Sequence, residues 1–294
     1  MNKIHSEVKE GRILISDGAW GTMLQQQGFQ PGECLERWNV DKREAVLAVA
    51  AAYIAAGADM IETNSFGGSR FKLAFYGLDK RVAELNEAAA AISREAAGSD
   101  RHVLGSIGPT GKLLLTREVT EADLYEAFRE QAVALEKGGA DACCIETFTD
   151  LAEALCAIRA VKDHTGLEII CTFTFDKTPK GEYRTIMGVT PAQMARAAIE
   201  AGADIIGANC GSGMARMVEV VREVRAVDRK TPILIHANAG LPVTDGERVT
   251  YPETPETMAS FFPALVAAGA NIIGGCCGTT PAHIDALVTA RRQA

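Results

Sequence analysis

The chain has 294 residues, of which 47% are hydrophobic and 23% are charged, and its net charge is −8. This composition is typical of a globular protein with a large core, and the acidic balance without any basic run argues against a nucleic-acid partner. No window of about 18 residues is apolar and uncharged, and the polar N-terminus does not resemble a signal peptide. We therefore expect no membrane span, and a cytoplasmic location in which the cysteines stay reduced.

Eight short apolar runs follow one another along the chain. They are almost continuously apolar, which is typical of parallel strands that are buried on both faces of a sheet. We predict strands at Ile13–Asp17, Met60–Asn64, Val103–Ile107, Ala142–Thr147, Ile169–Phe175, Ile205–Cys210, Ile233–Asn238 and Ile272–Cys276.

Amphipathic stretches rich in alanine separate these strands. The predicted helices include Glu44–Ala56, Val82–Ala97, Glu121–Lys137, Leu151–Lys162, Pro191–Ala201 and Pro255–Ala268. Eight alternating units of this kind predict an α/β fold, a closed (β/α)8 TIM barrel formed by a single domain over residues 1–294. An open doubly wound sheet is the alternative, but no Gly-x-Gly-x-x-Gly motif follows the first strand.

A four-residue pattern recurs four times, each time between a predicted helix and a predicted strand. The copies are Ala56–Asp59, Gly138–Asp141, Ala201–Asp204 and Ala268–Asn271, the last with Asn in place of Asp. The glycine in second position fits the left-handed residue that commonly ends a helix. The pattern therefore marks where helices end and strands begin.

Three cysteines stand apart from the rest. Cys276 and Cys277 are neighbours in a glycine-framed run, and Cys210 ends the sixth predicted strand. A disulfide between sequence neighbours is strained, whereas three thiolates with an open fourth position are typical of catalytic zinc. Because barrel chemistry occurs at the C-terminal ends of strands, we predict that these three cysteines bind Zn²⁺, with Asn238 on the strand between them. Three merely buried thiols are the alternative.

The other five cysteines lie mostly in apolar runs, where reduced core thiols are the simplest interpretation. They are Cys34, Cys143, Cys144, Cys156 and Cys171. His236 is interpreted as a core histidine, and His102 lies at the start of a strand, at the wrong end of the barrel for chemistry.

Three carboxylates, those of Asp17, Glu62 and Glu146, lie at the ends of predicted strands. Burying a carboxylate without a partner costs several kcal/mol. Each could cap a helix or form a rim salt bridge, but three at one mouth favour a site for a cation such as an amino-acid ammonium. The glycine-rich segments 18–22 and 108–111 offer backbone N–H groups that could hold a carboxylate.

Together these motifs resemble the zinc-dependent homocysteine S-methyltransferase family. The resemblance covers nearly the whole chain and is most similar to the homocysteine-binding module of cobalamin-dependent methionine synthase. It rests on Asp17–Met23, Glu62–Asn64, Gly108–Gly111, Glu146–Thr147, Ala208–Gly211 and Gly274–Gly278.

The resemblance implies a transferase that moves a methyl group to the thiolate of homocysteine and so forms methionine. It implies that Cys210, Cys276 and Cys277 are the zinc ligands and that Asn238 lies beside the metal, filling its open position until substrate arrives. Glu146 then holds the substrate ammonium. Asp17 and the backbone of Gly21 and Thr22 form a substrate-binding turn.

Two departures from the family pattern stand out. Trp20 occupies a position where a smaller or unbranched residue is more usual. Complete cobalamin-dependent methionine synthases also continue into folate, cobalamin and activation domains, so we expect either an excised fragment or an enzyme whose methyl donor, a methylated corrinoid, is carried by another protein.

Three other interpretations remain open. The donor could be S-methylmethionine, S-adenosylmethionine or betaine. The chain could be a catabolic, corrinoid-linked methyltransferase with another substrate. It could also be a non-catalytic zinc-binding module, although its intact substrate mouth argues against that.

Overall fold

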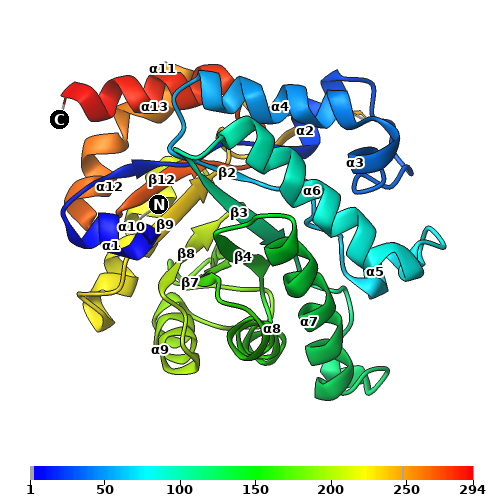
Figure 1. Ribbon diagram of the computed structural model, residues 1–294. Helices are drawn as coiled ribbons and strands as arrows, with labels where there is room; N and C mark the ends of the chain where they lie inside the picture. Colours follow the sequence, from blue (N-terminus) through cyan, green and yellow to red (C-terminus); the bar gives the residue numbers. More distant parts are fainter. Residues whose placement is uncertain (1–2, 247, 294) are drawn as a thin grey trace.

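The structure is a computed structural model that describes residues 3–246 and 248–293. Eight parallel strands form a nearly closed barrel in the order β1-β12-β9-β8-β5-β4-β3-β2, with helices around it (Figure 1). The strands are β1 (Leu14–Ile15), β2 (Met60–Glu62), β3 (His102–Ile107), β4 (Ala142–Phe148), β5 (Glu168–Phe173), β8 (Ile205–Asn209), β9 (Ile233–Ala237) and β12 (Ile272–Gly275). The predicted TIM barrel is confirmed.

Several observed strands end before the predicted ones do. Asp17 lies two residues beyond the end of β1, Cys210 follows β8, and Cys276 follows β12. The cause is local at Cys210, whose backbone has a φ of 59°, a left-handed conformation that cannot continue a strand. These expected site residues therefore lie just beyond the ends of the hydrogen-bonded strands.

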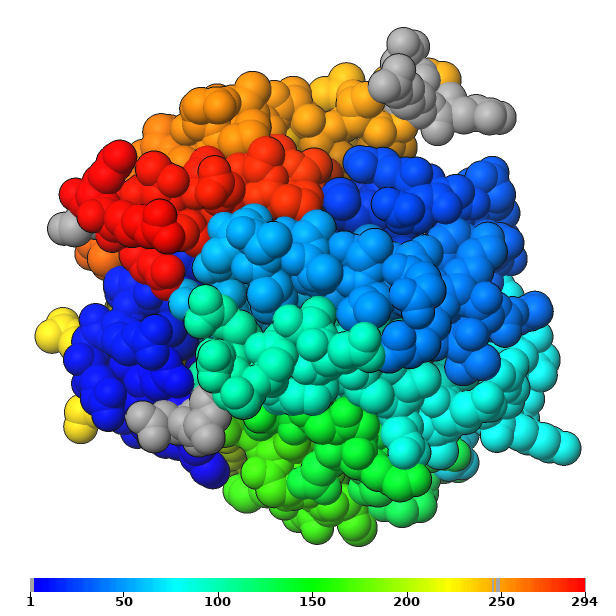
Figure 2. Space-filling model, turned by 45° about the horizontal axis from the view of Figure 1, so that its top comes forward, coloured from blue at the N-terminus to red at the C-terminus, as the bar shows by residue number. Residues whose placement is uncertain are grey.

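Most of the predicted helices form the outer layer, and helices that are neighbours around the barrel pack side by side, as α13, α4 and α6 do in Figure 2. The outer helices are α4 (Arg43–Ala55), α6 (Val82–Ala97), α7 (Glu121–Lys137), α8 (Leu151–His164), α9 (Pro191–Ala201), α10 (Met214–Val227), α11 (Pro255–Ser260), α12 (Phe262–Ala268) and α13 (Pro281–Gln293). Shorter helices are α1 (Ile4–Lys9), α2 (Gly21–Gln26), α3 (Trp38–Asp41), α5 (Arg70–Ala74), and the 3-10 turns η1 (Asp79–Arg81) and η2 (Leu114–Thr116).

The single helix expected over Pro255–Ala268 is two helices, α11 and α12. Pro263 explains the break, because its nitrogen has no hydrogen to donate and its ring clashes with the carbonyl one turn earlier. Two small hairpins also interrupt the βα connections: β6 (Asp176–Lys177) with β7 (Tyr183–Arg184), and β10 (Val243–Asp245) with β11 (Arg248–Thr250).

Helix α1 closes the N-terminal end of the barrel. Its Ile4 and Val8 join a buried cluster to which every barrel strand contributes: Leu14, Met60, Leu104, Ala142, Cys144, Ile170, Ile205, Leu234 and Ile272. Glu168 accepts hydrogen bonds from the backbone N–H groups of Ile4 (2.6 Å) and His5 (3.0 Å). This end of the barrel is therefore filled with apolar side chains and sealed.

The last residue of the recurring four-residue pattern joins two strands through a pair of hydrogen bonds, which we call a clip. Asp59, Asp141, Asp204 and Asn271 each donate a backbone N–H to the carbonyl of a residue on the preceding strand and accept that residue's N–H with a side-chain oxygen. The clipped residues are Ile15, Val103, Ile169 and Ile233. Each clip therefore joins an odd-numbered barrel strand to the even-numbered strand that follows it.

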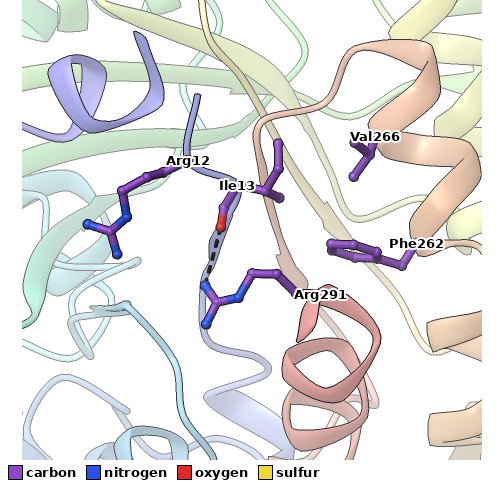
Figure 3. A pocket seen from close by; sticks show the side chains of 5 residues that line it. All are labelled: Arg12, Ile13, Phe262, Val266 and Arg291. Atoms are coloured by element: carbon purple, nitrogen blue, oxygen red, sulfur yellow. Dashed lines mark hydrogen bonds between the residues drawn. The ribbon is translucent and has the colours of Figure 1, made fainter. Parts of the chain in front are cut away.

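Cations reinforce three of the clips. Arg94 binds the carboxylate of Asp141, Arg225 donates to Asn271 (2.8 Å), and Arg291 binds the carboxylate of Asp59. Arg291 comes from the last helix and also donates to the Ile13 carbonyl (3.2 Å), beside a cavity of about 420 Å³ near the start of β1 (Figure 3). The C-terminal helix is thus tied to the first strand.

The seam between β1 and β2 is closed largely by side chains. Asp59 supplies its clip to Ile15, with distances of 2.7 and 2.8 Å. Further along, Asp17 Oδ2 accepts the backbone N–H of Glu62 at 2.9 Å. Two carboxylates therefore join the first and second strands, where β1 is only two residues long.

Replacing Asp204 tests the clips. Asp204→Ala should lower the free energy of unfolding by about 1–3 kcal/mol, because the N–H of Ile169 loses its acceptor. Asp204→Asn should stay close to the wild-type value, since Asn271 makes the same clip with an amide oxygen. Urea unfolding of both variants measures the difference, and equal losses would show that the side-chain oxygen is not what matters.

Candidate active site

A pocket of about 520 Å³ opens at the C-terminal ends of the strands. Its wall comes from the connections after β1, β2, β9 and β12 and from the strand ends between them. The three predicted zinc ligands, Cys210, Cys276 and Cys277, all line it. The fold therefore brings together the three cysteines that the sequence predicted to meet at the barrel mouth.

The three sulfurs form a compact triangle. Cys277 Sγ lies 3.9 Å from Cys210 Sγ and 4.0 Å from Cys276 Sγ, and all three sulfurs lie within 4.8 Å of one another. A tetrahedral zinc with Zn–S bonds of about 2.3 Å requires S–S separations of about 3.8 Å. The donor set and its spacing therefore fit a zinc ion with one position left over.

Backbone hydrogen bonds hold the cysteines in place. The N–H of Cys210 donates to the His236 carbonyl (2.9 Å) and the N–H of Cys276 donates to the Ala237 carbonyl (2.7 Å). Cys210 itself adopts a left-handed backbone with a φ of 59°. Such a conformation costs on the order of 1 kcal/mol and persists only where the surroundings enforce it, as functional sites often do.

The thiols share their protons. Hydrogen bonds from Cys210 and Cys276 lower the pKa of Cys277, whereas the hydrogen bonds of Cys276 to Cys210 and Cys277 raise the pKa of Cys276. Of the three thiols, Cys277 loses its proton most readily, whereas the pKa values of Cys210 and Cys276 are raised. A thiophilic cation would stabilise all three as thiolates.

Asn238 follows β9, the strand between those that deliver the cysteines. Its N–H donates to the Ser212 carbonyl (3.0 Å), and the next residue, Ala239, donates its own to the Cys277 carbonyl (3.0 Å). The Asn238 side-chain oxygen is buried and has no hydrogen-bond partner within residues 3–246 and 248–293. Asn238 is not among the residues that line the pocket, so its expected place beside the metal stays a prediction.

The three carboxylates expected at the mouth lie in two places. Glu62 and Glu146 line the pocket, whereas Asp17 is fully buried behind its wall. Asp17 Oδ2 accepts hydrogen bonds from the Glu62 N–H and from the Trp20 indole (both 2.9 Å). Trp20, the residue that departs from the family pattern, is thus the partner of Asp17 and part of the pocket wall.

Glu146 sits in a network of hydrogen bonds. The Ser106 hydroxyl donates to its Oε1 and the Asn209 amide donates to its Oε2 (3.2 Å). The pairing of β4 with β5 shifts register between Ile145 and Phe148, and Thr147 has a φ of 62°. This bulge directs Glu146 into the pocket, as bulges near active sites often do.

Burial controls protonation in this chamber. Desolvation, helped by the charge of Glu62, raises the pKa of Asp17 to about 7, and desolvation raises that of Glu62 to about 7. The pKa of Glu146 also rises, chiefly through burial, and burial lowers the pKa of His236. The predicted core histidine, His236, is buried as expected but faces the pocket.

Gly21 and Thr22 line the pocket where α2 begins. The first N–H groups of a helix have no partner within it, which makes such a turn suitable for an anionic group. Two further expectations concern residues away from this pocket. His102 is buried at the other end and contacts Glu7 (2.8 Å), and the five remaining cysteines are buried free thiols.

A family model described as homocysteine S-methyltransferase matches residues 14–291. The chain belongs to the homocysteine S-methyltransferase family. It is therefore a methyltransferase. Its relatives include methionine synthase of Mycobacterium tuberculosis, 33% identical across 97% of this chain and 25% of the relative, and methionine synthase of Mycobacterium leprae, 32% identical across 95% and 24%. The chain spans about a quarter of the length of these relatives.

Solved structures of a family protein share the fold. The metallated form of the homocysteine methyltransferase MmuM from Escherichia coli superposes with a TM-score of 0.81 at 22% identity, covering 100% of both chains. Its oxidized form gives 0.80 at 23% identity, covering 98% of this chain and 99% of the other. In the part of this methyltransferase that the structure describes, every helix is too short or too polar to cross a bilayer.

Sequence reasoning left several residues of this methyltransferase site unassigned. Tyr251 follows the β10–β11 hairpin, lines the pocket and helps to lower the pKa of Cys277, but the loop that carries it has no recognisable motif. Ser106 and Asn209 orient Glu146. Their alternation along the strands, on the same face as Glu62 and Glu146, is the signal that could have revealed them.

The buried Glu62 gives the metal-free methyltransferase a defined pH dependence. Its raised pKa means that the native state binds a proton more tightly than the unfolded state between pH 4.5 and about 7. Its contribution to the free energy of unfolding is therefore favourable at low pH and falls as the pH rises. Glu62→Gln removes this dependence, so the variant should gain on wild type by up to roughly 3 kcal/mol across that range.

Urea unfolding of both metal-free proteins between pH 4 and 8 measures the gain. Comparing the two proteins at each pH cancels the titration of the thiols, which both share. A constant difference at every pH would mean that Glu62 titrates normally in the native state.

Proposed function

We propose that this protein is a zinc-dependent methyltransferase that transfers a methyl group to homocysteine and forms methionine. The observation that carries the proposal is the triangle of Cys210, Cys276 and Cys277 at the mouth, beside a chamber of buried carboxylates. Metal and amino-acid recognition thus meet in one pocket. All eight cysteines are free thiols, which agrees with a reducing compartment such as the cytoplasm.

Zinc bound by Cys210, Cys276 and Cys277 would hold the substrate sulfur as a thiolate and keep it electron-rich enough to accept a methyl group. The remaining roles in this half of the site belong to protein side chains. Asn238, whose side-chain oxygen is buried and unpaired, would fill the open zinc position until substrate arrives. Tyr251 lines the same pocket and helps to lower the pKa of Cys277, which favours its thiolate form.

The amino-acid end of the substrate faces the opposite wall. Glu146, fixed by Ser106 and Asn209, receives the ammonium. The backbone of Gly21 and Thr22 at the start of α2 receives the carboxylate. Asp17 completes this turn from behind, because it holds Trp20 and the Glu62 backbone without entering the pocket.

The proposed methyl donor is a methylated corrinoid carried by another protein or domain. The likeness to methionine synthase supports it. So does the rim, where nearly all exposed large apolar side chains lie on βα connections, including Leu115 and Ile186 at 83% and 85% exposure. Such residues are typical of a surface that a partner covers for part of the time.

A small cationic donor is the second candidate, and one observation favours it. Trp20, Phe66 and Tyr251 all line the pocket. Aromatic faces attract sulfonium and quaternary ammonium groups by cation–π interaction. S-methylmethionine, S-adenosylmethionine and betaine carry such groups, and a catabolic corrinoid-linked reaction with another thiol would use the same zinc site.

Single cysteine variants test the metal site. Cys210→Ala, Cys276→Ala and Cys277→Ala should each lose most of the one zinc expected per chain, because two thiolates hold zinc far less well than three. Cys156→Ala is the matched control, a buried thiol outside the pocket. Metal analysis after dialysis decides, and full zinc in any of the three variants removes that residue from the ligand set.

A comparison of methyl donors tests which compound supplies the methyl group. Zinc-loaded protein and homocysteine should form methionine faster with methylcobalamin than with S-methylmethionine, S-adenosylmethionine or betaine at equal concentration. Mass spectrometry of the product measures the rates. A much faster reaction with a sulfonium or with betaine would overturn the corrinoid donor, and absence of methionine with every donor would overturn the proposed function.

A further inference from the structure

We infer that Thr279, assisted by Tyr53, is a positioning residue that couples the zinc-ligand turn to the substrate-binding turn. The zinc-ligand turn is residues 275–278, with two of the proposed ligands, and the substrate-binding turn is residues 17–22. Neither Thr279 nor Tyr53 lines the pocket, so both act from behind its wall. The inference rests on the proposed function, because it assumes a substrate whose sulfur binds zinc and whose carboxylate meets the substrate-binding turn.

The two turns lie beyond the ends of neighbouring strands. Strands β1 and β12 pair through only two residues each. After them, the Gly275 N–H donates to the Asp17 carbonyl (2.8 Å). Within the described chain, no backbone hydrogen bond joins residues 18–22 to residues 276–280. Side chains must therefore set how the turns sit relative to one another.

The Thr279 hydroxyl bridges the two turns. Its Oγ1 accepts the backbone N–H of Ala19 (3.0 Å) and donates its own proton to the Cys276 carbonyl (2.7 Å). Thr279 is fully buried, so bulk water cannot replace either hydrogen bond if the hydroxyl is lost. One oxygen atom therefore joins a residue of the substrate-binding turn to a proposed zinc ligand.

Tyr53 holds the same link from helix α4. Its hydroxyl donates to the Ala19 carbonyl (2.7 Å) and makes a longer contact with the Thr279 carbonyl (3.3 Å). Burial raises the pKa of the Tyr53 phenol well above its usual value, so the hydroxyl keeps its proton and stays a donor. Both polar backbone groups of Ala19 are thus occupied, the N–H by Thr279 and the carbonyl by Tyr53.

Glycines on both turns make room for this contact. A Cβ atom at Gly18 would lie 2.6 Å from Thr279 Oγ1, and one at Gly275 would lie closer still. A larger residue at either position would therefore push the hydroxyl out of place. Gly18 and Gly275 both line the pocket, so the hydroxyl lies directly behind the wall where the two turns meet.

A substrate that binds at two points makes the separation of the turns functional. Homocysteine has only two methylene groups between its sulfur and its α-carbon, so contact with both turns requires one fixed separation. With that separation, the second contact forms within the same complex and strengthens binding without any new group. We expect the Thr279 hydroxyl to favour homocysteine over simpler thiols without touching either.

Two thiols that differ only in their amino-acid end test the link: homocysteine and 1-propanethiol. Protein loaded with Co²⁺ in place of Zn²⁺ reports thiolate binding by its charge-transfer absorption. Thr279→Val keeps the shape but not the hydroxyl, so it should bind homocysteine about 10- to 100-fold more weakly than wild type, whereas its affinity for 1-propanethiol should change less than about threefold. Thr279→Ser keeps the hydroxyl and should bind both thiols nearly as wild type does.

Thr185→Val is the matched control. The Thr185 hydroxyl also donates to a carbonyl, that of Thr149 (2.8 Å), and accepts the backbone N–H groups of Met187 and Val189 (both 3.2 Å). Thr185 does not line the pocket. This variant should therefore keep the wild-type affinities for both thiols.

Tyr53→Phe tests the same link if Thr279→Val does not fold, because it removes only the donor to the Ala19 carbonyl. It should bind homocysteine about 3- to 10-fold more weakly, as expected for the loss of one neutral hydrogen bond, and 1-propanethiol as wild type does. Metal content and thermal unfolding of every variant show whether the metal site and the fold survive.

The outcomes separate the inference from the function on which it rests. The link is wrong if Thr279→Val binds homocysteine as tightly as wild type, loses its metal or weakens for both thiols equally. It is also wrong if Thr279→Ser is as impaired as Thr279→Val, or if Tyr53→Phe keeps the wild-type preference. If wild type itself binds homocysteine no more tightly than 1-propanethiol, the amino-acid acceptor of the proposed function fails. Selective loss of homocysteine binding in Thr279→Val, restored in Thr279→Ser, supports the inference.

Discussion

The carboxylate of Asp17 is the interaction on which the upper half of this barrel depends. It accepts one hydrogen bond from the backbone of β2 and another from the indole of Trp20. The first joins β1 to β2, which share no backbone ladder. The second fixes the ring that forms one side of the pocket. Without this carboxylate the seam would be held only by the Asp59 hydrogen bonds at its other end, and the Trp20 indole and the Glu62 N–H would lose their acceptor.

The two ends of the barrel interior differ in polarity. At the N-terminal end α1 places Ile4 and Val8 against a layer of aliphatic side chains, and the polar groups there are paired. At the other end the interior is polar, and Glu62, His236 and Asn238 each keep an unpaired atom. An apolar plug stabilises the fold, whereas unpaired polar atoms reduce its stability in exchange for binding. Stability and chemistry are thus separated along the barrel axis.

The sequence predicts the barrel well because buried parallel strands have a simple apolar signature. It also predicts the cysteine triangle, since residues at strand ends must meet at one mouth. It fails where one local contact decides. Asp17 and Trp20 are three residues apart, but nothing in the pattern says that the indole would take the carboxylate out of the pocket. The left-handed backbones of Thr147 and Cys210 are equally hidden, because tertiary contacts impose them on residues that disfavour them.

The aspartate and asparagine clips divide the barrel into four pairs of strands. Within each pair a side chain ties the second strand to the first, while Asp59, Asp141 and Asn271 reach the next pair through a backbone carbonyl that accepts from His102, Glu168 and Leu14. Each pair of strands is therefore joined internally by a side-chain clip. Neighbouring pairs are joined by backbone hydrogen bonds, which do not depend on side-chain identity. A barrel assembled in this way repeats one pair of hydrogen bonds four times around its axis. Because these hydrogen bonds lie at the starts of the strands, far from the mouth, the active-site loops could change in sequence without loosening the ring.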